Sequence, residues 1–361
     1  MVEWAGLENR NTRKRIVGSN PTLSANAFFR FFRRTFLFSA CALLLFVGLV
    51  FTAAAQKPLA PEVEAFIEDM VQKHQFKGDA LRRLLGQARP RPDVLRAISA
   101  PATARPWHEF RSRNVDSARI NGGTAFWREH AATLARASRE YGVPEEIIVA
   151  TIGVETRYGR NTGSHRVLDA LVTLAFQYPP RAELFRAQLE EYLLLVRETG
   201  FDAMRIRGSY AGAIGIPQFL PSSYRRYAVD FDGDGRRDLM GTTADAIGSI
   251  ANYYRAHGWR SGETVVVPAE AEGDGVDALL KAGIRPQLKI AEMRRLGVIP
   301  AVPVEDGVEA ALFVVETEAG PRYWLGLNNF YVITRYNRSV NYALAVHELA
   351  RELRARVKPE S

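Results

Sequence analysis

Residues 143–159, VPEEIIVATIGVETRYG, constrain the fold strongly, because they form a helical pattern that is apolar on almost every side. Pro144 and the acidic pair after it suit the first turn of a helix, and Gly159 suits its end. A helix of this composition is expected to lie in the protein core. Glu155 is the exception near its C-terminal end, and a carboxylate in such a place needs an explanation.

Further helices are predicted wherever apolar residues recur at helical spacing and proline or glycine marks an end. These segments are 61–76, 79–88, 122–142, 167–178, 182–200, 244–259 and 342–357. A partly extended stretch is predicted around Pro90, Pro92, Pro101 and Pro106. After Gly262 the pattern changes to β-branched alternation, which predicts strands within 263–269, 287–291, 308–317 and 322–327.

The expected architecture is therefore mainly α with a small β-rich insert. The expected parts are an N-terminal helical domain at 56–121, a helical core at 122–262, a β-rich subdomain at 263–326 and a return to the core with a C-terminal helix at 327–361. A hydrophobic content of 47% and a charged content of 24% are typical of a globular protein.

Residues 1–55 carry the pattern of an export signal. The basic stretch RFFRR at 30–34 precedes an apolar run at 35–51, and alanines at 53–55 resemble a cleavage site. We expect a cleaved signal peptide and a periplasmic protein, with an uncleaved membrane anchor as the alternative. Lipid attachment at Cys41 is disfavoured, because the apolar run continues past it. Residues 18–25 can be encoded by a string resembling a transfer-RNA gene, so we hypothesise that translation starts downstream of Met1.

The basic charge of the chain is concentrated at its N-terminus. Residues 1–55 hold seven Lys and Arg against two Glu, which leaves a net charge of only +3 of the total +8 for the remainder. This distribution argues against a nucleic-acid partner. We expect a monomer.

Glu155 is a candidate proton donor. A carboxyl group among apolar neighbours has a raised pKa and keeps its proton near neutral pH, as a general acid must. The alternative is an ordinary glutamate held by Arg157 or Arg160. The stretch 207–224 adds small residues that permit close approach of a ligand, followed by the amide of Gln218 and an aromatic ring, which are typical of a sugar site. Close helix packing is the alternative for those small residues.

The segment DFDGDGRRD at 230–238 follows the pattern of an EF-hand loop. Carboxylates occupy loop positions 1, 3, 5 and 9, and Gly235 occupies the sharp turn at position 6. The sequence therefore predicts a calcium site, with an acidic turn without metal as the alternative. The predicted side-chain ligands are Asp230, Asp232, Asp234 and Asp238, and Arg236 would contribute its backbone carbonyl. Position 12 departs from the pattern, because it is Gly241 instead of glutamate.

Five motifs together resemble the membrane-bound lytic murein transglycosylase B family, in the same order and at compatible spacing. They are ETRYGRNTG at 155–163, GSYAGAIGIPQFLPSSY at 208–224, the DFDGDGRRDL loop, ANYYRAHGW at 251–259 and NFYVITRYNRSVNYALAV at 329–346. The resemblance covers roughly 105–260 and 326–348. It implies a lysozyme-like catalytic core and structural Ca²⁺, with Asp245 completing the calcium shell.

The resemblance also implies an activity, which is cleavage of the β-1,4 bond between N-acetylmuramic acid and N-acetylglucosamine in peptidoglycan. The muramyl 6-hydroxyl attacks its own anomeric carbon and leaves a 1,6-anhydro end. Glu155 matches the single catalytic acid, which becomes the base. The implied sugar-site residues are Ser209, Gln218, Tyr253, Tyr336, Asn337 and Tyr342, and Arg181 matches a position that holds the peptide stem. Pro180 stands where the family can have a second arginine.

Three other functions stay open at this point. A water-using muramidase would need a second carboxylate, and the nearest in sequence, Asp169 and Glu183, are expected to be solvated on their helices. A catalytically silent, calcium-stabilised murein-binding module is disfavoured by Glu155 in an intact motif. A membrane-tethered scaffold protein would require the apolar segment to stay uncleaved.

Overall fold

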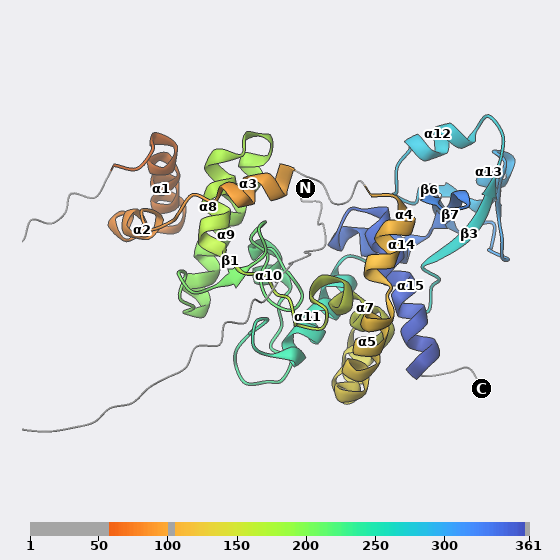
Figure 1. Cartoon of the computed structure of the whole chain (residues 1–361), viewed down its shortest axis with the longest axis horizontal. Helices are drawn as coiled ribbons and strands as arrows, with labels where there is room; N and C mark the ends of the chain where they lie inside the picture. The colour runs from red at the N-terminus through yellow and green to blue at the C-terminus, as the bar shows by residue number, and fades with distance from the viewer. Residues whose placement is uncertain (1–57, 100–104, 358–361) are drawn as a thin grey trace, which may run out of the picture. The chain divides into compact units, whose positions relative to one another are not determined.

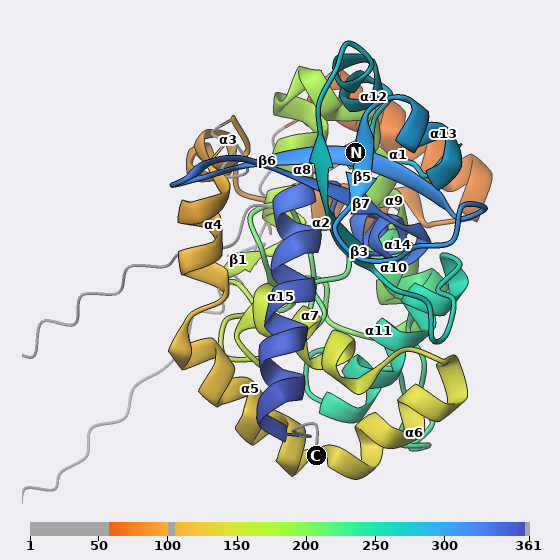
Figure 2. The ribbon, with the colours of Figure 1, turned by 90° about the vertical axis from the view of Figure 1, so that its right-hand side faces the viewer.

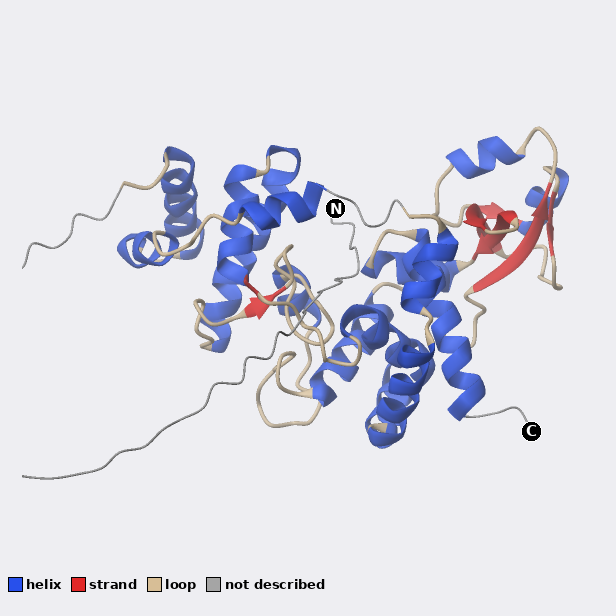
Figure 3. Cartoon of the chain, viewed as in Figure 1, coloured by secondary structure: helices blue, strands red, loops and turns tan. Residues whose placement is uncertain are grey.

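Helices supply most of the secondary structure in residues 58–99 and 105–357, the part of the chain that the computed structural model describes (Figure 1 and Figure 3). The helices up to the catalytic motif are α1 (Pro61–His74), α2 (Gly78–Leu85), α3 (Pro92–Ser99), α4 (Trp107–Asn114), α5 (Ser117–Glu129), α6 (Ala131–Tyr141) and α7 (Glu145–Thr156). Those after it are α8 (Val167–Gln177), α9 (Ala182–Thr199), α10 (Pro221–Tyr227), α11 (Thr243–Ala256), α12 (Val276–Lys281), α13 (Ile290–Arg295), α14 (Asn328–Tyr336) and α15 (Val340–Val357), with a 3₁₀ turn, η2, at Pro179–Arg181.

Several predictions fall on residues that the structure does not describe. The export signal, Cys41 and the downstream translation start all lie within residues 1–57. Among the described helices, none combines the length and the apolar character that a membrane crossing requires. Described residues from Leu59 onward belong to one compact unit.

The predicted core helix is α7, and it is enclosed on nearly all sides. Nine of its residues are buried, and the exceptions are Glu145, Glu146 and Glu155. Helices α5, α6, α11 and α15 contact it, and Figure 2 shows α15 running beside α7 and α5. Because its surroundings are apolar on every side, the helix needs the apolar pattern that the sequence provides.

A backbone turn of unusual conformation ends α7. Arg157 and Tyr158 have φ of 50° and 62°, and Gly159 follows with φ of 78°. The amide of Arg157 donates to the Gly153 carbonyl, and that of Tyr158 donates to the Ile152 carbonyl, so the last helical carbonyls are satisfied. Two left-handed residues other than glycine in succession are costly, and such turns concentrate at functional sites.

One local prediction is wrong, and another is confirmed only in part. The segment 122–142 is not one helix, because His130 (φ −110°, ψ 22°) separates α5 from α6. The break lets α5 pack against α15 while α6 packs against α11, and both contact α7. The stretch predicted to be partly extended contains a helix, because Pro92 begins α3, where a proline costs no hydrogen bond in the first turn, whereas Pro106 is extended with φ −54° and ψ 152°.

The strands form two antiparallel sheets. A short pair joins β1 (His165–Arg166) to β2 (Arg207–Gly208). The larger sheet has the order β4-β6-β7-β3-β5 and a hydrophobic core of its own. Its strands are β3 (Val266–Ala271), β4 (Leu288–Lys289), β5 (Val298–Pro300), β6 (Glu309–Thr317) and β7 (Gly320–Gly326). All five fall within the predicted β-rich stretch 263–326, although α12 and α13 interrupt it; the domain boundaries themselves stay predictions.

Candidate active site

Glu155 lies in the last turn of α7 with its side chain only partly exposed. The hydroxyl of Tyr342, on α15, donates a hydrogen bond to Glu155 Oε1 at 2.7 Å. Neither Arg157 nor Arg160 acts on the carboxyl group, so the alternative of an ion-paired surface glutamate is not what the described residues form.

Burial controls the protonation of Glu155. It raises the pKa of the carboxyl group from its usual 4.5 to about 8, and the Tyr342 hydrogen bond lowers it by a smaller amount. Burial dominates because removing a carboxylate from water costs more than one hydrogen bond returns. At neutral pH the group is therefore mostly protonated and is able to donate a proton.

A wall of aromatic side chains adjoins Glu155. Tyr336 is its centre, with ring centroids 4.8 Å from Tyr253, 5.7 Å from Phe219 and 6.4 Å from Tyr342. The hydroxyl of Tyr253 donates to the Arg335 carbonyl at 2.5 Å, and that of Tyr336 donates to the Pro217 carbonyl. These bonds fix the ring orientations, and fixed aromatic faces are what a sugar ring stacks on.

The polar residues predicted for the sugar site are buried, and most of their atoms serve the backbone. Ser209 Oγ accepts from the amides of Ala211 and Ala213, so it holds its own turn. Gln218 Nε2 donates to the carbonyls of Thr162 and Gly215, while its Oε1 is buried without a partner in the described residues. These contacts fix the loop opposite the ETRYG turn.

Asn337 and Arg181 lie in different surroundings. Asn337 is buried at the end of α14, and its Oδ1 accepts from the Ser339 amide at 3.2 Å. Arg181 is half-buried in the 3₁₀ turn η2 between α8 and α9. A cavity of about 270 Å³ gathers Gln218, Tyr253 and Tyr336 of the predicted site. The predicted residues that do not line it are Glu155, Ser209, Asn337, Tyr342 and Arg181.

Three of the predicted metal ligands lie close together. Carboxylate oxygens of Asp230, Asp232 and Asp245 are within 4.8 Å of one another. Asp245 is buried on α11, and it accepts from the amides of Phe231 (2.7 Å) and Asp238 (2.8 Å), so it ties the loop to the helix. A set of hard oxygens on a preformed loop fits a calcium ion.

The other predicted ligands point partly to the backbone. Asp234 Oδ1 accepts from the Arg236 amide at 2.8 Å, and Asp238 Oδ1 accepts from the amides of Met240 and Gly241. Asp230 accepts from three amides of the same loop, with Gly235 at 2.7 Å. Hydrogen bonds within the loop therefore help to set its turn.

A family model described as the transglycosylase SLT domain matches residues 59–351, which include Glu155, the aromatic wall and the acidic loop. The chain belongs to this transglycosylase family. It is 43% identical over 299 residues to membrane-bound lytic murein transglycosylase B of Escherichia coli strain K12, a match that covers 80% of this chain and 81% of the relative.

Solved structures of other family members have the same fold. The E. coli lytic transglycosylase Slt35 in complex with calcium is 41% identical, with a TM-score of 0.74, covering 82% of this chain and 94% of that one. SltB3 of Pseudomonas aeruginosa in complex with NAG-anhNAM-pentapeptide is 31% identical, with a TM-score of 0.70, covering 81% and 79%. The predicted mainly helical, lysozyme-like core is thereby confirmed.

The two carboxylates considered as a second acid in this transglycosylase differ from one another. Asp169 is buried, in contrast to the solvated residue that we predicted, because Arg166 Nη2 (2.6 Å) and the Arg89 amide (2.9 Å) both bond to it. Glu183 is exposed on α9, as predicted. Neither lines the cavity that contains Gln218 and Tyr253.

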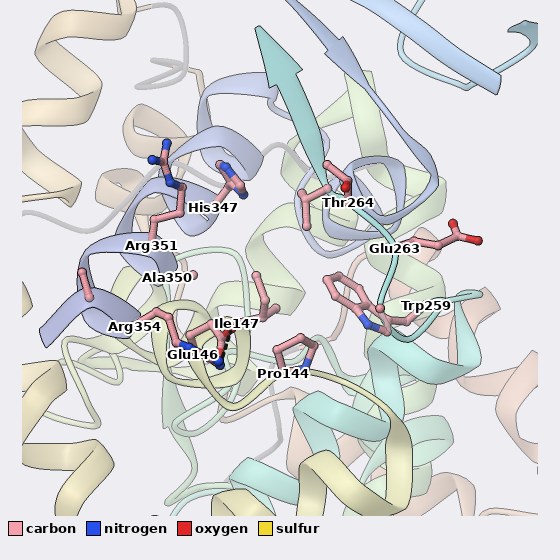
Figure 4. A pocket seen from close by; sticks show the side chains of 13 residues that line it. Pro144, Glu146, Ile147, Trp259, Glu263, Thr264, His347, Ala350, Arg351 and Arg354 are labelled. Carbon is pink, nitrogen blue, oxygen red and sulfur yellow. Dashed lines mark hydrogen bonds and ion pairs between the residues drawn. The ribbon is translucent and has the colours of Figure 1, made fainter. Parts of the chain in front are cut away.

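Another hollow, of about 630 Å³, lies at the opposite end of α7 (Figure 4). It is lined by Pro144, Ile147, Trp259, His347 and Arg351, among others, and Arg354 pairs with Glu146 at 3.3 Å on its rim. None of the predicted site residues lines it.

Two tyrosines that pack close to α7 are absent from the predicted site residues. Tyr254 is buried, exchanges a hydrogen bond with Thr151 at 2.8 Å, and lies 5.6 Å from the Tyr336 ring. Tyr158 donates its hydroxyl hydrogen to the Arg119 carbonyl at 2.8 Å. Both lie within the motifs ETRYGRNTG and ANYYRAHGW, but no spacing rule distinguishes them there as residues that pack against α7.

Proposed function

We propose that this family member is a lytic transglycosylase of murein, in which Glu155 acts first as acid and then as base. The observation that carries the proposal is a carboxyl group with a pKa of about 8 beside an aromatic wall. The names of its relatives, and the NAG-anhNAM-pentapeptide bound by SltB3, support a murein substrate and a 1,6-anhydro product.

The reaction needs one proton to move out and back. Protonated Glu155 donates to O4, the oxygen that links muramyl C1 to N-acetylglucosamine C4, and the C1–O4 bond breaks to leave a 4-hydroxyl group. The muramyl 6-hydroxyl oxygen then bonds to C1 while its proton passes to the Glu155 carboxylate. The carboxyl group is thereby restored, and no water is consumed. Tyr342 stabilises the intermediate carboxylate through its hydrogen bond.

A single carboxyl group is sufficient because the nucleophile belongs to the substrate. Glycosidases that use water or a covalent intermediate have two carboxylates about 5 to 9.5 Å apart. Among the described residues, no second carboxyl group acts on the pKa of Glu155, which is set by burial and by Tyr342. The tethered 6-hydroxyl replaces the second group by proximity. A hydrolytic muramidase is the alternative, and it differs in its product.

The substrate contacts follow from the aromatic wall. Tyr253, Tyr336 and Tyr342 would flank the sugar, supported by their packing. Gln218 and Asn337 would orient it, Ser209 would hold the loop beside it, and Arg181 would contact the peptide stem.

Ca²⁺ would bind the loop at 230–238 in a structural role. Asp230, Asp232 and Asp245 would be its first ligands, supported by their close approach and by the calcium complex of Slt35. Asp234, Asp238 and the Arg236 carbonyl would complete the shell. The ion would stabilise the loop against α11, and Glu155 would need no direct contact with it.

The protein would act in the periplasm, because its substrate is the cell wall and residues 1–55 carry an export pattern. It would act there as a monomer. No nucleic-acid partner is proposed.

Digestion of purified sacculi tests the activity. We expect mass spectrometry to find 1,6-anhydro ends after treatment with the mature protein, and none after Glu155→Gln. Glu183→Gln, an exposed change, is the matched control and should retain activity. Reducing ends from the wild type would establish hydrolysis, and no fragments at all would favour a silent binding module.

A further inference from the structure

Two arginines line the cavity beside the aromatic wall. Arg335 is in the last turn of α14, and Arg338 follows two residues after that helix. Both residues are exposed and belong to the lining of the cavity of about 270 Å³ that also contains Gln218, Tyr253 and Tyr336. Two cationic residues therefore border the space next to the proposed sugar site.

These arginines have no carboxylate partner in the described part of the chain. Several other arginines pair with an acid, such as Arg225 with Glu198 at 2.6 Å. Arg335 instead lies 5.9 Å above the Tyr331 ring. Burial, and then the charge of Arg335, lowers the pKa of Arg338, so the two cations repel one another.

The lining of the cavity has no negative charge. Besides the residues named, it comprises Leu184, Gln188, Phe219, Leu220, Ser222 and Ser223. Solvated surface arginines are the ordinary explanation for unpaired cations. Here the two share one concave site, where the field of like charges is concentrated and an anion is attracted.

We propose that Arg335 and Arg338 bind a carboxylate carried by the lactyl substituent of a muramyl residue. The inference rests on the proposed function, since only a murein strand places such a group beside the aromatic wall. A planar guanidinium bonds a carboxylate through two parallel hydrogen bonds, which lysine does not do. The carboxylate has two sources, the peptide stem or, in strands without peptide, the free lactyl group.

Binding to soluble glycan strands tests the inference in calcium-containing buffer, with the mature Glu155→Gln protein so that no strand is cut. Three strands are compared by calorimetry: peptide-bearing, amidase-treated with free lactyl carboxylates, and peptide-bearing with all carboxylates converted to methylamides. We expect the peptide-bearing strand to bind roughly tenfold more tightly than its methylamide form. Adding Arg335→Gln and Arg338→Gln should remove this difference.

The comparison is made within each variant, so a partial loss of folded protein does not change the ratio. Arg205→Gln is the control, because its side chain is 88% exposed and lines none of the cavities named above. If the amidase-treated strand also binds more tightly than the methylamide strand, and the two arginines are needed for this difference, the ligand is the free lactyl carboxylate. If only the peptide-bearing strand does so, the ligand is a carboxylate of the peptide stem. Equal affinity for charged and neutral strands, or a preference that survives the double change, overturns the proposal. Failure of the transglycosylase reaction would appear separately, as missing anhydro ends.

Discussion

Glu155 links protonation to both activity and stability. Its pKa is about 8 in the folded protein and near 4.5 when exposed, so the folded state binds this proton more tightly. Stability from this group is complete below about pH 4.5 and is lost as the pH rises through about 8. We predict that Glu155→Gln raises the melting temperature relative to wild type, by a difference that grows between about pH 5 and 8.

The same titration sets the rate. Proton donation by Glu155 requires the acid form, so the wild-type kcat/KM should fall as the pH rises through about 8. Glu183→Gln serves as the control in thermal melts, because an exposed glutamate has no burial to relieve. A melting difference independent of pH over this window would contradict burial as the cause of the raised pKa.

At the scale of elements, contact between α5 and the turn after α7 supports Glu155. An added Cβ at Gly123 would lie 2.4 Å from Tyr158 Oη and 2.6 Å from Leu353 Cδ2. We predict that Gly123→Ala destabilises the protein by about 1–3 kcal/mol, because the packed ring must move. It should also lower kcat, since Tyr158 stands three residues after the acid. Urea unfolding measures the loss of stability.

Gly307→Ala is the matched control, since a Cβ there would meet nothing within 4 Å. If the urea midpoint of Gly123→Ala equals that of the wild type, the close contact between Gly123 and Tyr158 does not contribute to stability.

How far the sequence predicts these elements depends on where the determining contacts lie. Periodicity predicts the ends of α8 and α9 to within one residue, because apolar residues recur at helical spacing in each of their turns. It could not find the break at His130, where the pattern stays helical and only the packing of α5 and α6 on different partners bends the chain. The helix that Pro92 begins lies inside a stretch predicted to be partly extended, because proline both ends and begins helices.

At the scale of the whole molecule, the site is assembled from distant segments. The bond between Tyr342 and Glu155 joins residues 187 positions apart, which no local spacing predicts. The burial of Asp169 likewise depends on the Arg89 amide, 80 positions away. Motif resemblance placed Tyr342 and Glu155 in one site. Nothing in the sequence marked Arg335 and Arg338 as neighbours of Leu184 in one cavity.

The acidic loop at 230–238 is expected to affect the stability of the whole protein. Asp230 and Asp232 are exposed, Asp245 is buried on α11, and their oxygens lie within 4.8 Å, so the carboxylates repel one another unless a cation joins them. Calcium at one hundred times its Kd would stabilise the fold by about 2.7 kcal/mol.

We therefore expect a chelator to lower the melting temperature by several degrees in scanning calorimetry, and Asp232→Asn to reduce this response. Asp277→Asn is the matched control, because Asp277 is an exposed aspartate on α12, outside the loop, and its loss should leave the chelator response intact. Identical wild-type melting temperatures with and without chelator would contradict the calcium proposal. A cation that joins a buried carboxylate to two exposed ones must stabilise the folded state over the unfolded chain.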